Sequence, residues 1–470
     1  MRIVPRLLIV IVTGLALAGA VSAQSFSERE EIAIFRLSYY GQPAYDPPPD
    51  VRVEIRGRRG SLSVELRGTG NRSYDDLFAR AFGAVDEEIR SVFINLGRFD
   101  VIGMDQRLTQ SSVDDFISAL SEYQAASAEV PEAVLLGQQA FTEEDFRELA
   151  GGFVVVVPSV SWYQLGRDEE GNFRAEMRTS FTFIDVADMR TFDQFFVETS
   201  GYAESPQDAV REAVDSVAGD LSYRVRSMER FRISTGVLEV DGREVIVEFG
   251  RNMGLRPGEE YALVAERVLS TGHVATTETG LILIREVHEE FSYGRVLYAS
   301  PRARPGDQLR EVPRRGFETT AYYDVLTNGL DVTSVIGIKA TAARGFYAAR
   351  PRVSLEVPLR GEISDGFFPV NLVLGGEWNA YLGRLRLTPS AGVGFGGAIP
   401  IDDDDLEPFY LSHLGAFARV SGSLLVTRDL LVTVHTGLGY WFGLAGDSGS
   451  AISELSSYGG LIIGGGVTFK

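Results

Sequence analysis

The last third of the chain alternates apolar residues with small or polar residues over long, uninterrupted segments. Such alternation is typical of a β-strand whose two faces meet different surroundings. A strand that crosses a membrane within a barrel needs an apolar outer face and a small or polar inner face. Eight segments fit this pattern, at 316–326, 331–342, 346–358, 368–381, 384–397, 409–425, 429–444 and 456–470. The sequence therefore predicts an eight-stranded antiparallel transmembrane β-barrel over 316–470.

The links between these segments differ in length. The second, fourth and sixth links are short, whereas the third, fifth and seventh links are longer and polar. Outer-membrane barrels have short turns on the periplasmic side and longer loops on the outer side. The first link, Thr327–Gly329, departs from the pattern because it is short although it belongs to the outer side. An even number of strands returns Lys470 to the periplasmic side.

Charged residues within these segments mostly share the register opposite to the apolar face. An eight-stranded barrel has an interior only wide enough for side chains. The shared register therefore predicts a network of salt bridges that fills the interior and leaves no open channel. A soluble sandwich with a charged outer face is the alternative, but segment length, frequent glycine and aromatic residues near the segment ends favour the barrel. The predicted lumen network consists of Arg352, Glu356, Glu377, Arg384, Arg386 and Arg419.

The first 23 residues have the pattern of a secretory signal peptide. Arg2 and Arg6 precede an apolar run, and Val21-Ser22-Ala23 forms a small-residue cleavage site. The alternative, a membrane-anchor helix, needs a longer apolar run with a charged stop. No second apolar stretch of about 18 residues follows, so a helical span is not expected elsewhere. We therefore expect export to the cell envelope and insertion into the outer membrane by strands.

Residues 24–228 have the pattern of a mixed α/β domain. Ser205 followed by Pro206 is a strong helix start, because serine caps helix N-termini and proline fits the first helical position. Strands are expected at 32–40, 99–104, 153–165 and 174–186, helices at 75–95, from Ser112 and at 206–225, a Pro-rich loop at 45–49 and a charged hairpin at 51–66.

Residues 229–315 change to short strands separated by turns. Two Pro-Gly turns, Arg256–Glu259 and Arg304–Asp307, lead into strands that are expected to end at Val264 and Val312. A Pro-Gly pair supplies the fixed φ and the positive φ that a type II turn requires. The pattern predicts a small β-barrel of SH3-like size.

Parts of the chain resemble known envelope proteins. Leu96–Ile102 resembles the helix-to-strand segment of the TolB-N/CsgG-like periplasmic fold, and Val237–Val247 followed by Met253–Tyr261 is similar to the C-terminal domain of the flagellar assembly protein T family. This resemblance implies a TolB-N-like domain joined to a small β-domain, with a periplasmic scaffolding or assembly role and no catalysis. The fused barrel departs from the family pattern. The ending Val467–Lys470 resembles an outer-membrane assembly signal, with a lysine after the usual final aromatic residue.

The charge balance and the residue inventory exclude several kinds of function. The formal net charge of -20 argues against nucleic acid as a partner, because phosphates require a basic surface. The chain has no cysteine, which excludes disulfides, thiolate metal sites and a cysteine nucleophile. Its four histidines lack the spacing of a zinc site.

Three motifs resemble catalytic or ligand-binding segments without the context that these require. Gly446–Ser450 resembles the nucleophile segment of chymotrypsin-like proteases, but the only histidine nearby is His435, and no cognate histidine segment lies upstream. Gly392–Gly397 resembles a phosphate-binding loop, but no helix follows it. An acidic run in the longest outer loop is a weak candidate for Ca²⁺, and a solvated loop is favoured. That run is Asp402, Asp403, Asp404 and Asp405.

These features predict an outer-membrane-anchored periplasmic scaffold or assembly protein that is not an enzyme and uses no cofactor. Its expected partners are outer-membrane lipid and periplasmic protein, with no nucleic acid and no small-molecule substrate. A component of an envelope transport or secretion system is one alternative, because CsgG-like domains can belong to pores. An envelope enzyme is the other alternative.

Overall fold

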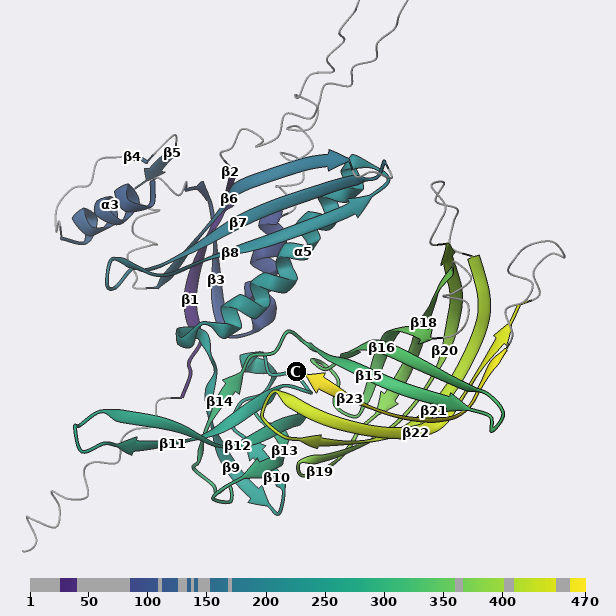
Figure 1. Ribbon diagram of the computed structural model, residues 1–470. Coiled ribbons are helices and arrows are strands. Elements are labelled where there is room, and N and C mark those ends of the chain that lie inside the picture. The colour runs from purple at the N-terminus through teal and green to yellow at the C-terminus, as the bar shows by residue number, and fades with distance from the viewer. Residues whose placement is uncertain are drawn as a thin grey trace, which may run out of the picture.

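The chain forms three parts in sequence order (Figure 1): an α/β domain, a small closed barrel and an eight-stranded barrel. The computed structural model describes residues 26–39, 85–108, 112–125, 133–136, 139–142, 153–167, 171–359, 367–400, 410–444 and 457–470. The predicted signal peptide Met1–Ala23, the Pro-rich loop 45–49 and the hairpin 51–66 lie outside these residues.

The α/β domain is built on one mixed sheet. In this sheet β1 pairs in parallel with β3 and β6, and β6, β7 and β8 continue it as antiparallel neighbours. The strands are β1 (Glu30–Arg36), β2 (Ser38–Tyr39), β3 (Phe99–Arg107), β6 (Val154–Arg167), β7 (Phe173–Asp185) and β8 (Arg190–Ala203). A separate hairpin joins β4 (Ala133–Leu136) and β5 (Gln139–Thr142). β8 has no counterpart among the predicted strands.

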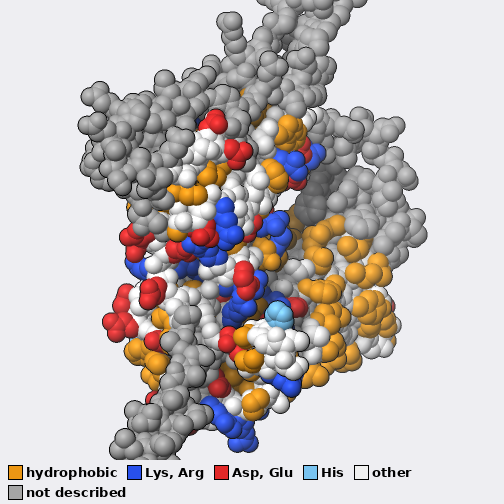
Figure 2. Space-filling view, turned by 90° about the vertical axis from the view of Figure 1, so that its left-hand side faces the viewer, with side chains coloured by type: hydrophobic (Ala, Val, Ile, Leu, Met, Phe, Trp, Pro, Cys, Tyr) orange, Lys and Arg blue, Asp and Glu red, His pale blue; other side chains and the backbone are white. Residues whose placement is uncertain are grey.

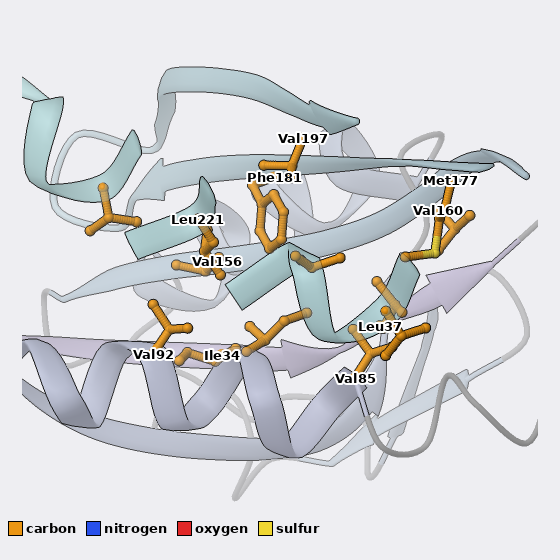
Figure 3. Close-up of a cluster of buried hydrophobic side chains, with 14 of the residues drawn as sticks. Ile34, Leu37, Val85, Val92, Val156, Val160, Met177, Phe181, Val197 and Leu221 are labelled. Carbon is orange, nitrogen blue, oxygen red and sulfur yellow. The ribbon is translucent and has the colours of Figure 1, made fainter. Parts of the chain in front are cut away.

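Helices cover both faces of this sheet. A helix described over 85–96 and α5 (Pro206–Ser227) cover one face, and α3 (Val113–Ala125) lies against the other. The valine run of β6 serves both sides, since Val154 and Val156 face the first pair and Val155 faces α3. A strand covered on both faces needs such a continuous apolar run. Figure 3 shows the larger core, where Val156, Phe181 and Leu221 meet between sheet and helices.

The predicted start of α5 is confirmed. The backbone N–H of Asp208 donates a hydrogen bond to the Ser205 hydroxyl at 3.2 Å, and Pro206 occupies the first turn. This contact satisfies one of the amide groups that a helix leaves unpaired at its start.

The second part is a closed barrel of six strands in the order β10-β13-β12-β11-β14-β9. Both predicted Pro-Gly turns are present, because Gly258 and Gly306 have φ of +83° and +87° and the backbone N–H groups of Glu259 and Asp307 close them. β11 continues past the expected Val264, and with β12 it forms a projecting hairpin arm (Figure 1). The elements are η2 (Glu229–Phe231), β9 (Ser234–Asp241), β10 (Glu244–Val247), η3 (Arg251–Met253), β11 (Glu260–Val268), β12 (Val274–Val287), β13 (Ser292–Ala299) and β14 (Gln308–Val312).

The last part is a closed antiparallel barrel of eight strands, as predicted. Its ring runs β18-β17-β16-β15-β23-β22-β21-β20 and closes through the pairing of β18 with β20, while β19 continues β18 beyond Asn379. The strands are β15 (Phe317–Thr327), β16 (Val332–Ala342), β17 (Ala349–Leu359), β18 (Phe367–Trp378), β19 (Ala380–Leu382), β20 (Leu385–Pro400), β21 (Tyr410–Leu425), β22 (Leu430–Gly443) and β23 (Tyr458–Phe469).

The two faces of these strands differ sharply in chemistry. Apolar side chains such as Leu355, Val434 and Ile463 lie on the outer surface with about half or more of their area exposed. In Figure 2 hydrophobic side chains gather on the barrel at the right, whereas acidic and basic side chains gather on the N-terminal parts. Among the described helices, none is long and apolar enough to cross a membrane.

Candidate functional site

The small domain closes one end of the eight-stranded barrel. At this end, which we call the base, lie the turns 343–348, 383–384 and 426–429 and the C-terminal Lys470. The backbone N–H of Gly345 donates a hydrogen bond to the carbonyl oxygen of Pro257 at 2.8 Å. A Cβ atom at Gly258 would lie 2.1 Å from the carbonyl oxygen of Ala343, so this approach requires glycine. An apolar cluster seals the contact and contains Ala262, Val264, Leu281, Leu283, Leu297, Val312, Tyr381, Leu425 and Leu431.

Buried ion pairs join all three parts above the base. Glu311 of β14 accepts hydrogen bonds from Arg98 at 2.6 Å and from Arg226 of α5 at 2.7 Å. Glu259 then pairs with Arg226 at 3.4 Å and with Arg344 of the barrel turn at 2.8 Å. We call Arg98, Arg226, Glu259, Glu311 and Arg344 the interdomain ion network. It links the α/β domain, the small domain and the barrel in one connected set of contacts.

The pKa values within this network follow from burial and from opposite charge. Burial opposes ionisation of Glu311, but the charges of Arg98 and Arg226 outweigh it and lower the pKa of Glu311 to about 2. Burial also opposes the charge on Arg226, yet Glu311 and Glu259 raise the pKa of this guanidinium. Glu311 and Arg226 are therefore both charged at neutral pH. Since desolvated charges are costly unless paired, removal of one partner is expected to destabilise the junction.

A second set of ion pairs ties the linker and the C-terminus to the same place. Glu260 of β11 pairs with Arg314 at 2.8 Å and with Lys470, and Arg314 also pairs with Asp429 of a barrel turn. Burial raises the pKa of Glu260, but Lys470 and Arg314 together lower it below its ordinary value. The last residue of the chain is therefore fixed against the small domain.

Five of the six residues predicted for the lumen network are buried inside the barrel. They are Arg352, Glu356, Glu377, Arg386 and Arg419. The prediction for Arg384 is wrong. β20 begins only at Leu385, so Arg384 belongs to the turn at the base, where its side chain leaves the lumen. Its guanidinium stacks on the Tyr298 ring of the small domain at 3.9 Å and donates to the carbonyl oxygen of Leu425 at 3.1 Å.

The interior charges pair with partners that the prediction did not include. Arg419 pairs with Asp324 at 3.0 Å and with Glu356 at 3.1 Å. Glu377 pairs with Lys339 at 3.1 Å. Glu318 forms salt bridges with Arg350 at 3.0 Å and with Arg386 at 2.6 Å. The residues that the prediction missed are Glu318, Asp324, Lys339 and Arg350. Each lies on the inward face of β15, β16 or β17, so assigning alternate residues of these strands to the inner and outer faces would have identified it.

The end of the barrel far from the base is filled by apolar and aromatic side chains. Trp441 stacks on Tyr458 with the ring centroids 6.0 Å apart. A Cβ atom at Gly394 would lie 2.2 Å from the Trp441 ring, and one at Gly415 would lie 2.4 Å from it. The glycines of the motif Gly392–Gly397 therefore make room for bulky interior side chains within β20, instead of cradling a phosphate.

The described residues hold no group of three or more potential metal ligands. His435 lies inside the barrel and pairs with Asp324, so its position is explained by the charge network. The serine motif Gly446–Ser450 and the candidate Ca²⁺ ligands Asp402, Asp403, Asp404 and Asp405 lie outside the described residues.

Comparisons with known proteins leave the chain without a family. No family model matches it, and no curated protein matches it. A solved protein of Xanthomonas campestris is 10% identical, with 42% of this chain and 85% of that chain covered and a TM-score of 0.20. A hypothetical protein of Chlamydia trachomatis is 7% identical, with 42% and 95% covered and a TM-score of 0.20. OmpT, an outer membrane protein of Vibrio cholerae, is 9% identical, with 67% and 96% covered and a TM-score of 0.15.

These TM-scores are too low for the similarities to carry an argument about fold or function. The barrel assignment therefore rests on the strand pairing described above. The resemblance of the N-terminal parts to the flagellar assembly protein T family stays a prediction.

Proposed function

We propose that the eight-stranded barrel spans the outer membrane and holds the α/β and small domains in the periplasm as a rigid, non-catalytic docking platform for other envelope components. The observation that carries this proposal is a closed barrel with an apolar outer surface and a charge-paired interior. Soluble proteins rarely expose large continuous apolar surfaces. A lipid surrounding explains why the leucines and valines of this barrel face outward while its charges face inward.

The base faces the periplasm in this proposal. Short turns lie at the base, and short turns are typical of the periplasmic side of outer-membrane barrels. Both N-terminal domains are attached at the same end, which agrees with their export ahead of the barrel by the predicted signal peptide. The first link of the barrel, with Asn328 exposed, would then face the outside.

Rigidity is the property that favours a platform over a loosely tethered binding domain. The interdomain ion network and the apolar cluster at the base fix the α/β domain relative to the barrel. A partner bound to that domain would be held at a defined distance and orientation from the membrane. The partner is proposed to be a periplasmic protein or another envelope component.

A transport or secretion role is the second candidate, and the filled interior argues against it. Charge pairs occupy the middle of the lumen, and Trp441 and Tyr458 occupy its far end. We expect no single-channel conductance above that of a bare bilayer after reconstitution of the full chain. A stable conductance that persists after repurification would favour the transport role.

The absence of cysteine permits a direct test of topology. Thr271→Cys places a thiol on the exposed hairpin arm, and Asn328→Cys places one on the exposed link at the far end. A maleimide on a polyethylene glycol chain too large to cross the outer membrane should label only Asn328→Cys in intact cells. Both variants should be labelled after lysis. Labelling of Thr271→Cys in intact cells would contradict the proposed orientation.

The docking role is tested by crosslinking in intact envelopes. The same Thr271→Cys thiol, loaded with a heterobifunctional crosslinker, should capture a discrete periplasmic protein that Asn328→Cys does not capture. Recovery of the same products with both variants would argue against docking by the periplasmic domains.

A further inference from the structure

A cavity with three arginines lies at the base of the barrel, between the small domain and the turn that follows β19. It has a volume of about 840 Å³. Arg243 precedes β10, Arg302 follows β13 and Arg384 follows β19, so the three cations come from three different elements. Figure 1 shows β10, β13 and β19 together at this junction.

None of these three side chains forms a salt bridge within the part of the chain that the structure describes. Arg384 contacts the Tyr298 ring and backbone carbonyl oxygens, and its neighbours in the cavity wall are apolar residues such as Leu297 and Val296. No acidic residue is found among the described residues that line the wall. Unpaired arginines at one place are notable in a chain with 65 acidic and 45 basic residues.

A second cavity at the base provides the contrast. It is bounded by Arg314, Arg428 and Lys470, and each of these cations pairs with a carboxylate. Arg314 and Lys470 share Glu260, and Arg428 pairs with Glu278. Carboxylates therefore pair with most of the cations in that cavity, Arg315 excepted. Among the described residues, Arg243, Arg302 and Arg384 have no carboxylate partner.

Two of the three arginines meet at the turn between β19 and β20. A Cβ atom at Gly383 would lie only 2.0 Å from Nη1 of Arg243, so the guanidinium of Arg243 lies directly on the turn that carries Arg384. Gly383 also has φ of +71°, which favours glycine. Two cations that line the same cavity gain stability from an anion that bridges them.

The cavity lies where the lipid-facing surface begins. Leu382 and Leu385 lie on either side of the turn Gly383-Arg384, and Leu424 pairs with Leu385. All three leucines are exposed on the outer face. Tyr298 adds an aromatic ring with a polar end, which is typical of the membrane interface. Arginine binds phosphate through paired N–H groups. The three arginines therefore match the phosphate headgroup of a lipid, and the apolar wall with the adjoining leucines matches the upper part of its acyl chains.

We propose that Arg243, Arg302 and Arg384 bind the phosphate headgroup of an anionic phospholipid in the periplasmic leaflet. This inference rests on the proposed membrane insertion of the barrel. The bound lipid joins the small domain to the barrel turn, and its acyl chains follow the leucines at the start of β20.

Native mass spectrometry of the full-length protein in detergent micelles tests this site. The probes are phosphatidylglycerol, phosphatidylcholine with the same chains, and glycerol 3-phosphate. The parent should retain phosphatidylglycerol several times better than phosphatidylcholine and should bind glycerol phosphate far more weakly. Loss of one cation near a membrane surface should weaken phosphatidylglycerol binding by roughly fivefold in Arg302→Gln and in Arg384→Gln.

Arg304→Gln is the matched control, because Arg304 is exposed two residues from Arg302 and does not line the cavity. It should bind like the parent. Equal binding by Arg302→Gln and Arg304→Gln would overturn the site. The Arg302 side chain is exposed and forms no hydrogen bond or salt bridge with the described residues, so its replacement should leave folding unchanged. Equal binding of glycerol phosphate and lipid would overturn the lipid as the source. If the unsubstituted protein is recovered from outer membranes, either of these two results refutes the lipid site alone. If the unsubstituted protein is absent from membranes, the proposed function itself is refuted.

Discussion

Replacing Glu311 with glutamine should loosen the junction between the α/β domain and the small domain. Glu311 is fully buried and bonds to Arg98 and Arg226, so the substitution leaves two buried cations without their shared anion. Its pKa falls from 4.5 to about 2, which corresponds to roughly 3 kcal/mol of stability at neutral pH. Breaking a buried ion pair typically costs about 3–5 kcal/mol, which agrees. We therefore expect Glu311→Gln to cost about 3 kcal/mol.

Hydrogen–deuterium exchange of the full-length protein in micelles measures this loss locally. A loss of about 3 kcal/mol should raise exchange in β14 and in the last turns of α5 by roughly a hundredfold. Glu289→Gln is the control, because Glu289 forms an exposed pair with Arg251 at 3.4 Å that should contribute less than about 1 kcal/mol. Equal protection of β14 in the two variants would refute the role assigned to Glu311.

The pH dependence has a defined sign. Because the pKa of Glu311 is lowered in the folded state, its stabilisation is present above about pH 4.5 and is lost as the pH falls toward about 2. After correction for intrinsic exchange, the parent and Glu311→Gln should differ at pH 7 and at pH 5 and converge toward pH 2. A difference that stays constant across this range would contradict the assignment.

Three further predictions concern the barrel and the soluble part. Glu377→Ala should lower the denaturant midpoint of the barrel in micelles more than Leu374→Ala. The substitution removes a buried carboxylate and leaves the partly buried Lys339 without its partner, at a cost of up to about 3–5 kcal/mol, whereas Leu374 is a half-exposed outer residue. A midpoint equal to that of the parent would refute the lumen assignment. Gly394→Val should lower the free energy of unfolding by about 1–3 kcal/mol in the same assay, because its Cβ would lie 2.2 Å from the Trp441 ring. Gly422→Val is the control and should be nearly neutral, because nothing lies within 4 Å of a Cβ atom at Gly422. Equal effects of the two substitutions would contradict this packing. Residues 24–315 alone should give a soluble protein with a cooperative thermal melt, since the α/β domain and the small domain each have their own core. A flat melt with random-coil circular dichroism would count against this prediction.

The eight-stranded barrel was predictable because the alternation of apolar with small or polar residues runs along the whole length of its strands. Alternation between an outward apolar residue and an inward small or polar residue depends only on neighbours along the chain. The same alternation placed Arg352, Glu356, Glu377, Arg386 and Arg419 correctly in the interior. It failed for Arg384 because a strand pattern does not show where the strand gives way to its turn. At the end of a strand the side chain is no longer confined by the barrel wall.

The interdomain ion network could not be found in the same way. Arg98 and Glu311 are 213 residues apart, and Glu259 and Arg344 come from different parts of the fold. Each residue alone has the appearance of an ordinary surface charge, because no local pattern records which domain will pack against it. β8 was missed for a different reason, since two adjacent phenylalanines, Phe195 and Phe196, hide the alternation in its sequence, although burial alternates through them in the strand. The ion network shows contacts between distant segments deciding what local sequence leaves open, whereas β8 pairs with β7, the strand directly before it in the chain.

Heat modifiability of the full-length protein in isolated outer-membrane fractions tests the central claim most directly. A closed barrel in lipid resists detergent until it is boiled, so its compact form migrates faster on a denaturing gel. We expect the protein to be recovered with the outer membrane, to migrate faster without boiling, and to shift to slower migration after boiling. Recovery in the soluble periplasmic fraction with one mobility before and after boiling would contradict a membrane-spanning barrel.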